Sequence, residues 1–454
     1  MKKIFSKAGV SLQNRVNVLS IRLARPLFAV LIAAFSATTY AQSGTNSPYS
    51  QYGLGELTDQ AVGFNHGMNG LGLGFREHNQ VNFLNPASYS ALDSLTFILD
   101  AGASGQITNF KEGNKKVNAN NADFEYVVAG LRLAKHVGLS LGLVPYSNIG
   151  YNYSTSNYVD DTKSVIYTNT YSGSGGIHEA YLGMGWEPFK GFSFGFNAGY
   201  LWGDYTKSFV NAYSETQAKT LSKYYNADVR SYKVDFGMQL TAKLSKKDWL
   251  TLGLTYGMGH KIGGDPTCLV ISNNSQTGVA DTASYPAAGK LELEIPTTFG
   301  AGITLNHNNK WKLGADYMLQ KWSQVEYPEY EEQSGQPIYH LKEGLFKDRQ
   351  RITVGGDFCP KEDGKHFFSR IHYRAGFSYA TPYLIVNGGD GPKEMSASVG
   401  LGIPIINAWN NRSQLNISAQ WVKQSAKNLI TENTFRITIG LTFNERWFDK
   451  WKVE

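Results

Sequence analysis

From about residue 94 onward, apolar and polar side chains alternate along the chain with a period of two. In the last such segment, arginine, threonine and glycine separate the apolar residues Phe435, Ile437, Ile439, Leu441 and Phe443. A period of two places successive side chains on opposite faces of a β-strand. Each segment therefore has one apolar face and one face of glycine, serine, threonine and charged residues.

Fourteen segments show this alternation, and we expect each of them to be a strand. They lie near 94–106, 123–134, 137–150, 175–187, 191–206, 228–244, 248–260, 289–306, 310–326, 347–358, 366–381, 393–404, 412–424 and 433–444. Short turns alternate with long polar connections, which lie around 107–122, 151–174, 207–227, 261–288, 327–346 and 382–392. An even number of strands with long connections at one end is typical of outer-membrane barrels.

The polar face of these strands also carries charged side chains. Five of them are Glu292, Glu294, Asp316, Arg351 and Arg374. A soluble β-sandwich, the main alternative, cannot hold charges between its sheets, whereas a closed barrel encloses a polar lumen and has no open edge. The charged residues either gate the bore and steer a ligand, or form a polar network that fixes other segments to the wall, because an unpaired buried charge is costly.

Composition agrees with a membrane β-protein. Charged residues are 18% of the chain, against about 25% in soluble globular proteins. The mean hydropathy of −0.31 argues against a bundle of membrane-spanning helices, each of which needs about 20 apolar residues. Residues 1–41 hold six basic and no acidic residues, and the remainder is neutral, which argues against a nucleic-acid-binding protein.

Residues 1–41 have the features of an export signal. A basic stretch precedes an apolar core over 27–35, and Thr39-Tyr40-Ala41 suits cleavage before Gln42. We therefore expect a signal peptide over 1–41 and a location in the outer membrane of a Gram-negative cell. The two cysteines, Cys268 and Cys359, fall at opposite ends of the predicted barrel, where no disulfide can join them.

Residues 42–93 do not alternate and are rich in glycine. Glycine lets a chain turn in a crowded space, so we interpret this stretch as a plug folded into the lumen; a disordered periplasmic leader is the alternative. The prediction is thus an all-β protein, a 14-stranded antiparallel transmembrane β-barrel with an N-terminal plug. Its parts are the plug over 42–93, the barrel over 94–444 and a periplasmic tail over 445–454.

Several short motifs resemble one known family. They are Gly67-Met68-Asn69-Gly70, Asn85-Pro86-Ala87, Pro296-Thr297-Thr298-Phe299-Gly300, Leu313-Gly314-Ala315-Asp316-Tyr317 with Trp322-Ser323, and Arg374-Ala375-Gly376-Phe377 with Thr381-Pro382. Together they resemble the FadL-type long-chain fatty acid transporters of Gram-negative outer membranes. The resemblance implies a fourteen-stranded barrel closed by an N-terminal hatch with an Asn-Pro-Ala motif. Unlike many members, this chain continues past its last predicted strand to Glu454, and its outer loops differ, so the substrate stays open.

Pro145 interrupts the third predicted strand. Proline cannot donate a hydrogen bond to the strand ladder and marks an edge, a bulge or a break. In FadL-like barrels the third strand is kinked and opens a side window next to the hatch. The hypothesis is that Pro145 unpairs the strand locally, with Asn85, Pro86 and Ala87 packed behind it. The alternative is that Pro145 only ends the strand above the membrane.

The resemblance implies passive uptake of a hydrophobic small molecule or lipid, either fatty-acid-like or aromatic. The alternative function is a non-transporting barrel that acts as scaffold or partner in an outer-membrane secretion or assembly complex, with an outer-membrane or periplasmic protein as its partner. A water-filled porin ranks third, because the plug would block the bore. The sequence holds no metal-binding, cofactor-binding or catalytic motif, and we predict no enzyme.

Overall fold

The computed structural model describes residues 44–446, except 160, 162, 216, 275, 334–335, 363 and 406–412. The predicted signal peptide lies outside the described residues. Of the predicted tail, Glu445 and Arg446 belong to the last strand, and residues 447–454 lie outside the described part. Within the described ranges, no helix has the length and apolar character needed to cross a membrane.

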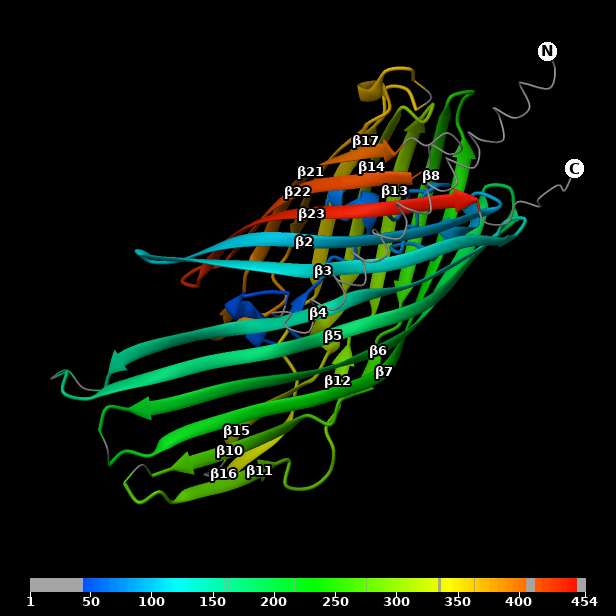
Figure 1. The fold of residues 1–454 in the computed structure, drawn as a ribbon. Coiled ribbons are helices and arrows are strands. Elements are labelled where there is room, and N and C mark those ends of the chain that lie inside the picture. Colours follow the sequence, from blue (N-terminus) through cyan, green and yellow to red (C-terminus); the bar gives the residue numbers. More distant parts are fainter. Residues whose placement is uncertain are drawn as a thin grey trace, which may run out of the picture. The chain divides into compact units, whose positions relative to one another are not determined.

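Fourteen antiparallel strands form a closed barrel (Figure 1), because the last strand pairs with the first. In order around the wall they are β2 (Thr96–Glu112), β3 (Lys115–Ala134), β4 (Val137–Tyr158), β5 (Ile166–Phe189), β6 (Phe192–Tyr213), β7 (Thr220–Lys243), β8 (Asp248–Gly257), β13 (Thr298–His307), β14 (Trp311–Gln320), β17 (Arg349–Phe358), β18 (His372–Ala380), β21 (Lys393–Ile405), β22 (Ser413–Ser425) and β23 (Thr431–Arg446). This confirms the predicted fourteen-stranded fold.

The alternation in the sequence decides which side chains face outward. In β8, Leu252 and Leu254 are exposed on the outer face, whereas Thr251 is buried inside. We call the end at which β2 begins and β23 ends the terminal end, and the opposite one the loop end. The connections at the terminal end are mostly tight turns, such as the one at His136 between β3 and β4.

Three of the predicted long connections mostly continue the barrel strands. β2 and β3 continue through 107–122 to a turn at Gly113, and β4 to β7 extend through most of 151–174 and 207–227. β5 and β7 each contain 24 residues, whereas a tilted strand needs about 9–11 to span a bilayer. We call the loop-end parts of these four strands, residues 150–158, 166–174, 204–213 and 220–227, the projecting sheet. β10 (Thr267–Asn273) and β11 (Ala280–Tyr285) continue it beyond β7.

Three predicted strands are too long, and one of them, 310–326, ends as β14 at Gln320. Residues 289–306 divide into β12 (Leu293–Ile295), which pairs with β9 (His260–Gly263), and the barrel strand β13. Pro296 lies between them and cannot donate to the ladder. Glu292 and Glu294 therefore lie in the β9–β12 region at the loop end, and the prediction that they line the barrel wall is wrong. Similarly, β18 begins at His372, six residues later than predicted.

The remaining short elements lie in the connections. They are η5 (Trp322–Gln324), β15 (Tyr327–Gln333), β16 (Gln336–Lys342), η6 (Phe367–Ser369), β19 (Ile385–Val386) and β20 (Gly389–Asp390). β15 pairs with β16 and β19 pairs with β20, so each pair forms a small separate sheet at the loop end.

Residues 44–95, called the N-terminal segment below, pack against inward-facing residues of the wall. The segment contains η2 (Pro48–Gln51), β1 (Glu56–Leu57), η3 (Gly63–Met68) and η4 (Pro86–Ala91). Its side chains Phe64, Met68, Leu71 and Phe75 form a buried cluster of their own. The segment therefore has an apolar core although its sequence shows no regular period.

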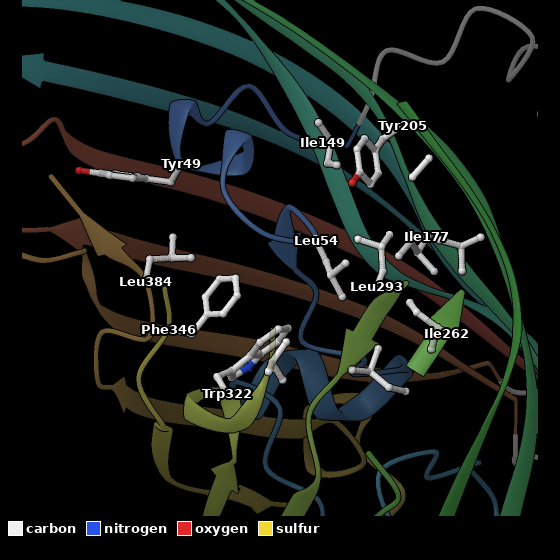
Figure 2. Packing of buried hydrophobic residues seen from close by; sticks show 14 of the residues in the cluster. Tyr49, Leu54, Ile149, Ile177, Tyr205, Ile262, Leu293, Trp322, Phe346 and Leu384 are labelled. Carbon is white, nitrogen blue, oxygen red and sulfur yellow. The ribbon is translucent and has the colours of Figure 1, made fainter. Parts of the chain in front are cut away.

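A larger apolar cluster joins the N-terminal segment to the loop end. Tyr49 and Leu54 of the segment lie among Trp322 and Phe346 of the connections and Ile177 of β5 (Figure 2). Each of these five side chains is almost completely buried. Burial of such a side chain is worth about 1.5–3 kcal/mol, so this cluster stabilises the position of the segment.

Candidate functional site: the break between β3 and β4

The wall of the barrel is interrupted beside Pro145. The pairing of β3 with β4 begins at the terminal end and stops at Val127 and Leu143. Beyond this point β3 remains paired with β2, and β4 remains paired with β5 after a bulge between Pro145 and Ser147. Figure 1 shows β3 and β4 diverging here, with the N-terminal segment visible between them. We call this place the lateral break.

The N-terminal segment pairs with the edge of β4 that β3 leaves. Glu56 and Leu57 of β1 lie opposite Asn148 and Ser147 in antiparallel register. The next residue, Thr58, donates its backbone N–H to the Tyr146 carbonyl oxygen at 3.2 Å and its hydroxyl to the Pro145 carbonyl oxygen at 2.7 Å. In this way β1 takes over hydrogen bonds of the β4 edge that β3 does not make.

The Asn-Pro-Ala motif occupies a different place from the one predicted. Asn85 caps η4 by accepting the Ala87 N–H at 3.1 Å, and it donates to the Leu73 carbonyl oxygen at 2.8 Å. A Cβ built on Gly237 of β7 would lie 2.2 Å from the Asn85 side-chain oxygen. The motif thus fits against β7, while the contact behind Pro145 comes from Thr58.

A small charged cavity of about 50 Å³ adjoins the lateral break. Its lining includes the acidic side chains Glu56, Asp59, Asp123, Glu125 and Glu394 together with His66 and Arg436. Burial raises the pKa of Glu56 and lowers the pKa of His66. Burial alone would also raise the pKa of Asp59, but the guanidinium groups of Arg351 and Arg436 outweigh it and hold that pKa below its usual value. The cavity favours charged groups over an apolar ligand.

Ion pairs fasten the N-terminal segment to strands on different sides of the barrel. Asp59 binds Arg351 of β17 at 2.5 Å, and Glu77 binds Lys312 of β14 at 2.6 Å. A third pair joins Arg76 to Glu187 near the end of β5 at 2.7 Å. These pairs are largely buried, and removal of one partner from such a pair is strongly destabilising.

The other predicted lumen residues also meet the segment or its surroundings. Asp316 of β14 accepts the backbone N–H groups of Gly72 and Leu73 at 2.7 and 2.9 Å. Arg374 of β18 donates to Asp357 at 2.8 Å and to Asn416 at 2.6 Å. Of the five charged residues that alternation placed in the lumen, the structure brings Asp316, Arg351 and Arg374 to the inward face.

Sequence reasoning missed the partners that the segment supplies. Thr58, Asp59 and Glu77 lie in a stretch without periodicity, so no pattern indicates which way they point. The alternation does indicate Lys312 as a lumen residue, because it lies on the polar face of its strand between the exposed residues Trp311 and Leu313. The described residues contain no cluster of histidine, cysteine and acidic side chains arranged to hold a metal ion.

The fold is shared with solved structures of hydrophobic-compound channels. The toluene transporter TbuX of Ralstonia pickettii has a TM-score of 0.55 at 13% identity, covering 84% of this chain and 98% of that one. A Pseudomonas aeruginosa FadL homologue has a TM-score of 0.56 at 13% identity, with coverage of 84% and 98%. The CymD monoaromatic hydrocarbon channel has a TM-score of 0.54 at 16% identity, with coverage of 85% and 98%. At such identities the likeness defines the class of fold.

The match to a family model is more specific than the similarity of fold. The model of the family described as BamG matches residues 23–454, so the chain belongs to the BamG family. The FadL-type architecture predicted from the motifs is therefore confirmed at the level of the fold, whereas the family match is to BamG. No curated protein matches the chain.

Proposed function

We propose that this protein is a non-conducting outer-membrane barrel that serves as a scaffold for a protein partner, which binds the outer face of the projecting sheet. The observation that carries the proposal is the packing of the N-terminal segment against inward-facing residues of the wall. Exposed apolar side chains around the wall, such as Leu254, Ile303 and Val354, fit a lipid environment. The connections at the loop end are mostly longer than those at the terminal end, which supports the orientation with the loop end outside the cell.

The cavities described beside the N-terminal segment are small, and each is lined in part by charged side chains. Three cavities that border it measure about 50, 40 and 90 Å³, whereas an engineered apolar cavity that binds benzene measures about 150 Å³. The largest of the three is lined in part by Lys233 and Asp235, which pair with each other. A hydrophobic molecule that entered here would have to displace the hydrogen-bonded backbone of the N-terminal segment and separate buried charges, which is costly.

The projecting sheet offers a surface beyond the span that a bilayer requires. Its inner face carries Tyr151, Tyr153 and Tyr171, which pack toward the N-terminal segment. Its outer face carries hydroxyl groups that bond across strands, as in the pairs Ser154–Thr170 at 3.2 Å and Ser172–Ser208 at 2.7 Å. A broad polar sheet with few charged residues, anchored in a membrane barrel, is suited to hold a partner in a fixed orientation.

Site-specific photocrosslinking in intact cells tests this function. A benzoylphenylalanine at Thr170, on the outer face of the sheet, should give one defined protein adduct, and a Ser172→Arg change should abolish it. The matched control is Leu182, which faces outward on the same strand but at the depth of the lipid, and should give no such adduct. Absence of an adduct at Thr170, Thr206 and Ser154 would overturn the proposal.

The lateral break favours a second candidate, the uptake of a hydrophobic compound that leaves sideways into the membrane. The bulge at Pro145 and the end of the β3–β4 ladder support this candidate. Two of the structurally similar proteins are a toluene transporter and a monoaromatic hydrocarbon channel. This candidate requires β1 to leave the β4 edge. A disulfide between Leu57→Cys and Ser147→Cys should then abolish uptake of labelled toluene by cells, and a reductant should restore it.

A further inference from the structure

At the terminal end, residues 359–371 join β17 to β18 through a folded loop, called the Phe loop below. The backbone N–H of Lys361 donates to the Ser369 carbonyl oxygen at 2.8 Å, and that of Gly364 donates to the Lys361 carbonyl oxygen at 3.0 Å. η6 (Phe367–Ser369) lies within the loop and appears as the short coil beyond the end of β17 in Figure 1. These bonds give the loop a defined shape.

The loop presents two adjacent phenylalanines to the outside. Phe367 is 46% exposed and Phe368 is 72% exposed, and their rings contact each other at 5.5 Å between centroids. The Tyr373 hydroxyl donates to the Phe368 carbonyl oxygen at 3.2 Å. Tyr373 is exposed on the outer face of β18 and its ring contacts Phe358, so the loop backbone lies beside the outer wall of the barrel.

Other large apolar side chains are exposed at the same end of the barrel. They are Leu133 at the end of β3, Phe189 at the end of β5, Leu244 after β7 and Trp311 at the start of β14. Apolar and aromatic residues form such a ring where the wall of a membrane barrel crosses the boundary between hydrocarbon and headgroups. Phe367 and Phe368, in the connection between the paired strands β17 and β18, add to this ring.

Basic side chains accompany the pair. Lys361 and Lys365 are exposed and Arg370 is half-buried, with no hydrogen-bond partner for its Nε among the described residues. Glu362 is also exposed, and the sequence of the loop contains Asp363. Lys361, Lys365 and Arg370 outnumber these two acidic residues, so the loop has a small basic excess. Long basic side chains beside a buried apolar anchor place their charged ends at lipid phosphates.

We propose that the Phe loop is a membrane-interface anchor. Phe367 and Phe368 insert between the headgroups of the phospholipid leaflet at the terminal end, and Arg370 binds a lipid phosphate. The occupant is a lipid surface because the loop is folded along the outer wall and continues the existing apolar ring. The anchor is independent of the function of the lateral break and of the projecting sheet.

Electron paramagnetic resonance on the full-length barrel in liposomes of phosphatidylethanolamine and phosphatidylglycerol tests the anchor. Cys268→Ser and Cys359→Ser provide a background for single labels at Phe368→Cys and, independently, Phe367→Cys. Both labels should collide with dissolved oxygen more than with a water-soluble nickel chelate, as a label at the lipid-facing Leu182 does. A label at Glu362, in the same loop, should show the opposite preference.

Two results would overturn the proposal. One is a nickel accessibility at positions 367 and 368 equal to that at 362, which would leave the pair in water and open to a protein partner. The other is a label depth in the parent that stays the same when phosphatidylglycerol is replaced by uncharged lipid. The parent should move outward on that replacement, and the variant should not respond.

Discussion

At the scale of single residues, the N-terminal segment and the wall meet backbone to backbone. A Cβ added at Gly253 of β8 would lie 1.9 Å from the Leu73 carbonyl oxygen, and one added at Gly376 of β18 would lie 2.4 Å from the Met68 backbone. Real Cβ atoms cannot approach backbone atoms so closely. Glycine at these inward positions is therefore a condition for the segment to lie where it does.

Gly253→Ala should displace the segment and destabilise the protein. Overpacking of this kind costs about 1–3 kcal/mol, so we expect a lower midpoint in guanidinium unfolding of the detergent-solubilised barrel. Gly105→Ala in β2 is the matched control, because a Cβ there meets nothing within 4 Å. Equal midpoints for the two variants would mean that the segment does not press on β8.

Asp316 shows a second way in which one residue holds the segment. Its carboxylate accepts two backbone N–H groups, from Gly72 and Leu73, and each buried amide left without an acceptor costs about 1–3 kcal/mol. A carboxylate that replaces two missing backbone partners explains how irregular chain is tolerated inside a barrel.

At the scale of elements, β4 to β7 are the longest strands of the barrel, and each has about twice the residues that a bilayer span requires. β8, β13, β14 and β17 contain 10 residues each, close to the length that a bilayer requires. The outer face of the longer strands changes from leucine and aromatic residues to serine and threonine toward the loop end. We expect the change in side chains to mark where the strands leave the lipid.

An arginine scan across the outer face tests that boundary. Leu254→Arg, on an outward position 46% exposed near the middle of β8, should cost about 2–4 kcal/mol if the position meets lipid. Thr206→Arg, outward on the projecting sheet, should be nearly neutral. The measurement is the free energy of unfolding in liposomes; equal effects at both positions would contradict the placement.

The ion pairs of the N-terminal segment make its attachment depend on pH. Arg351 holds the pKa of Asp59, and Lys312 the pKa of Glu77, below the usual values against the opposing effect of burial. A carboxyl group with a depressed pKa contributes stability above its unfolded pKa, near 4, and loses it as the pH falls through the folded pKa. Acidification from pH 7 to below about 4 should therefore loosen the segment.

A spin label at Gln60 measures that loosening. Its mobility should be low at pH 7 and should rise progressively as the pH is lowered below about 4. The double variant Asp59→Asn, Glu77→Gln should be mobile already at pH 7 and respond little to acid. A label whose mobility is the same at every pH in the parent would show that the pairs do not hold the segment.

The elements that sequence could predict are those with a repeating pattern. Alternation located all fourteen barrel strands, because one face meets an apolar environment and the other does not. It failed on the projecting sheet, where Tyr153 and Tyr171 alternate with serine and threonine and the stretch resembles a polar loop. Pro145 indicated the site of a break, but the occupant of the β4 edge could not be predicted, since β1 is two residues long and about ninety residues away in sequence.

The charged partners illustrate the same limit. Asp316, Arg351 and Arg374 were found because they stand on the polar face of regular strands. Asp59 and Glu77, which bind two wall residues, lie in chain without a period, and only the fold brings them to Arg351 and Lys312. Contacts between irregular chain and a wall depend on the whole barrel rather than on local sequence.

At the scale of the whole molecule, a barrel with the fold of hydrocarbon channels has its N-terminal segment packed against inward-facing residues of the wall. The N-terminal segment pairs with β4, binds β14 and β17 through ion pairs, and contributes Tyr49 and Leu54 to the apolar cluster at the loop end. Membership of the BamG family sets the chain apart from the channels whose architecture it shares. We therefore expect the function to reside on the outside of the barrel.

Flux through the purified protein tests that assignment most directly. Liposomes that contain the full barrel, and matched empty liposomes, are mixed with labelled toluene or a labelled fatty acid, and the rate of appearance inside is measured. We expect equal rates for both preparations, because a non-conducting barrel adds no path for the compound. A faster rate with the barrel, slowed by the Leu57→Cys/Ser147→Cys disulfide and restored by a reductant, would contradict it.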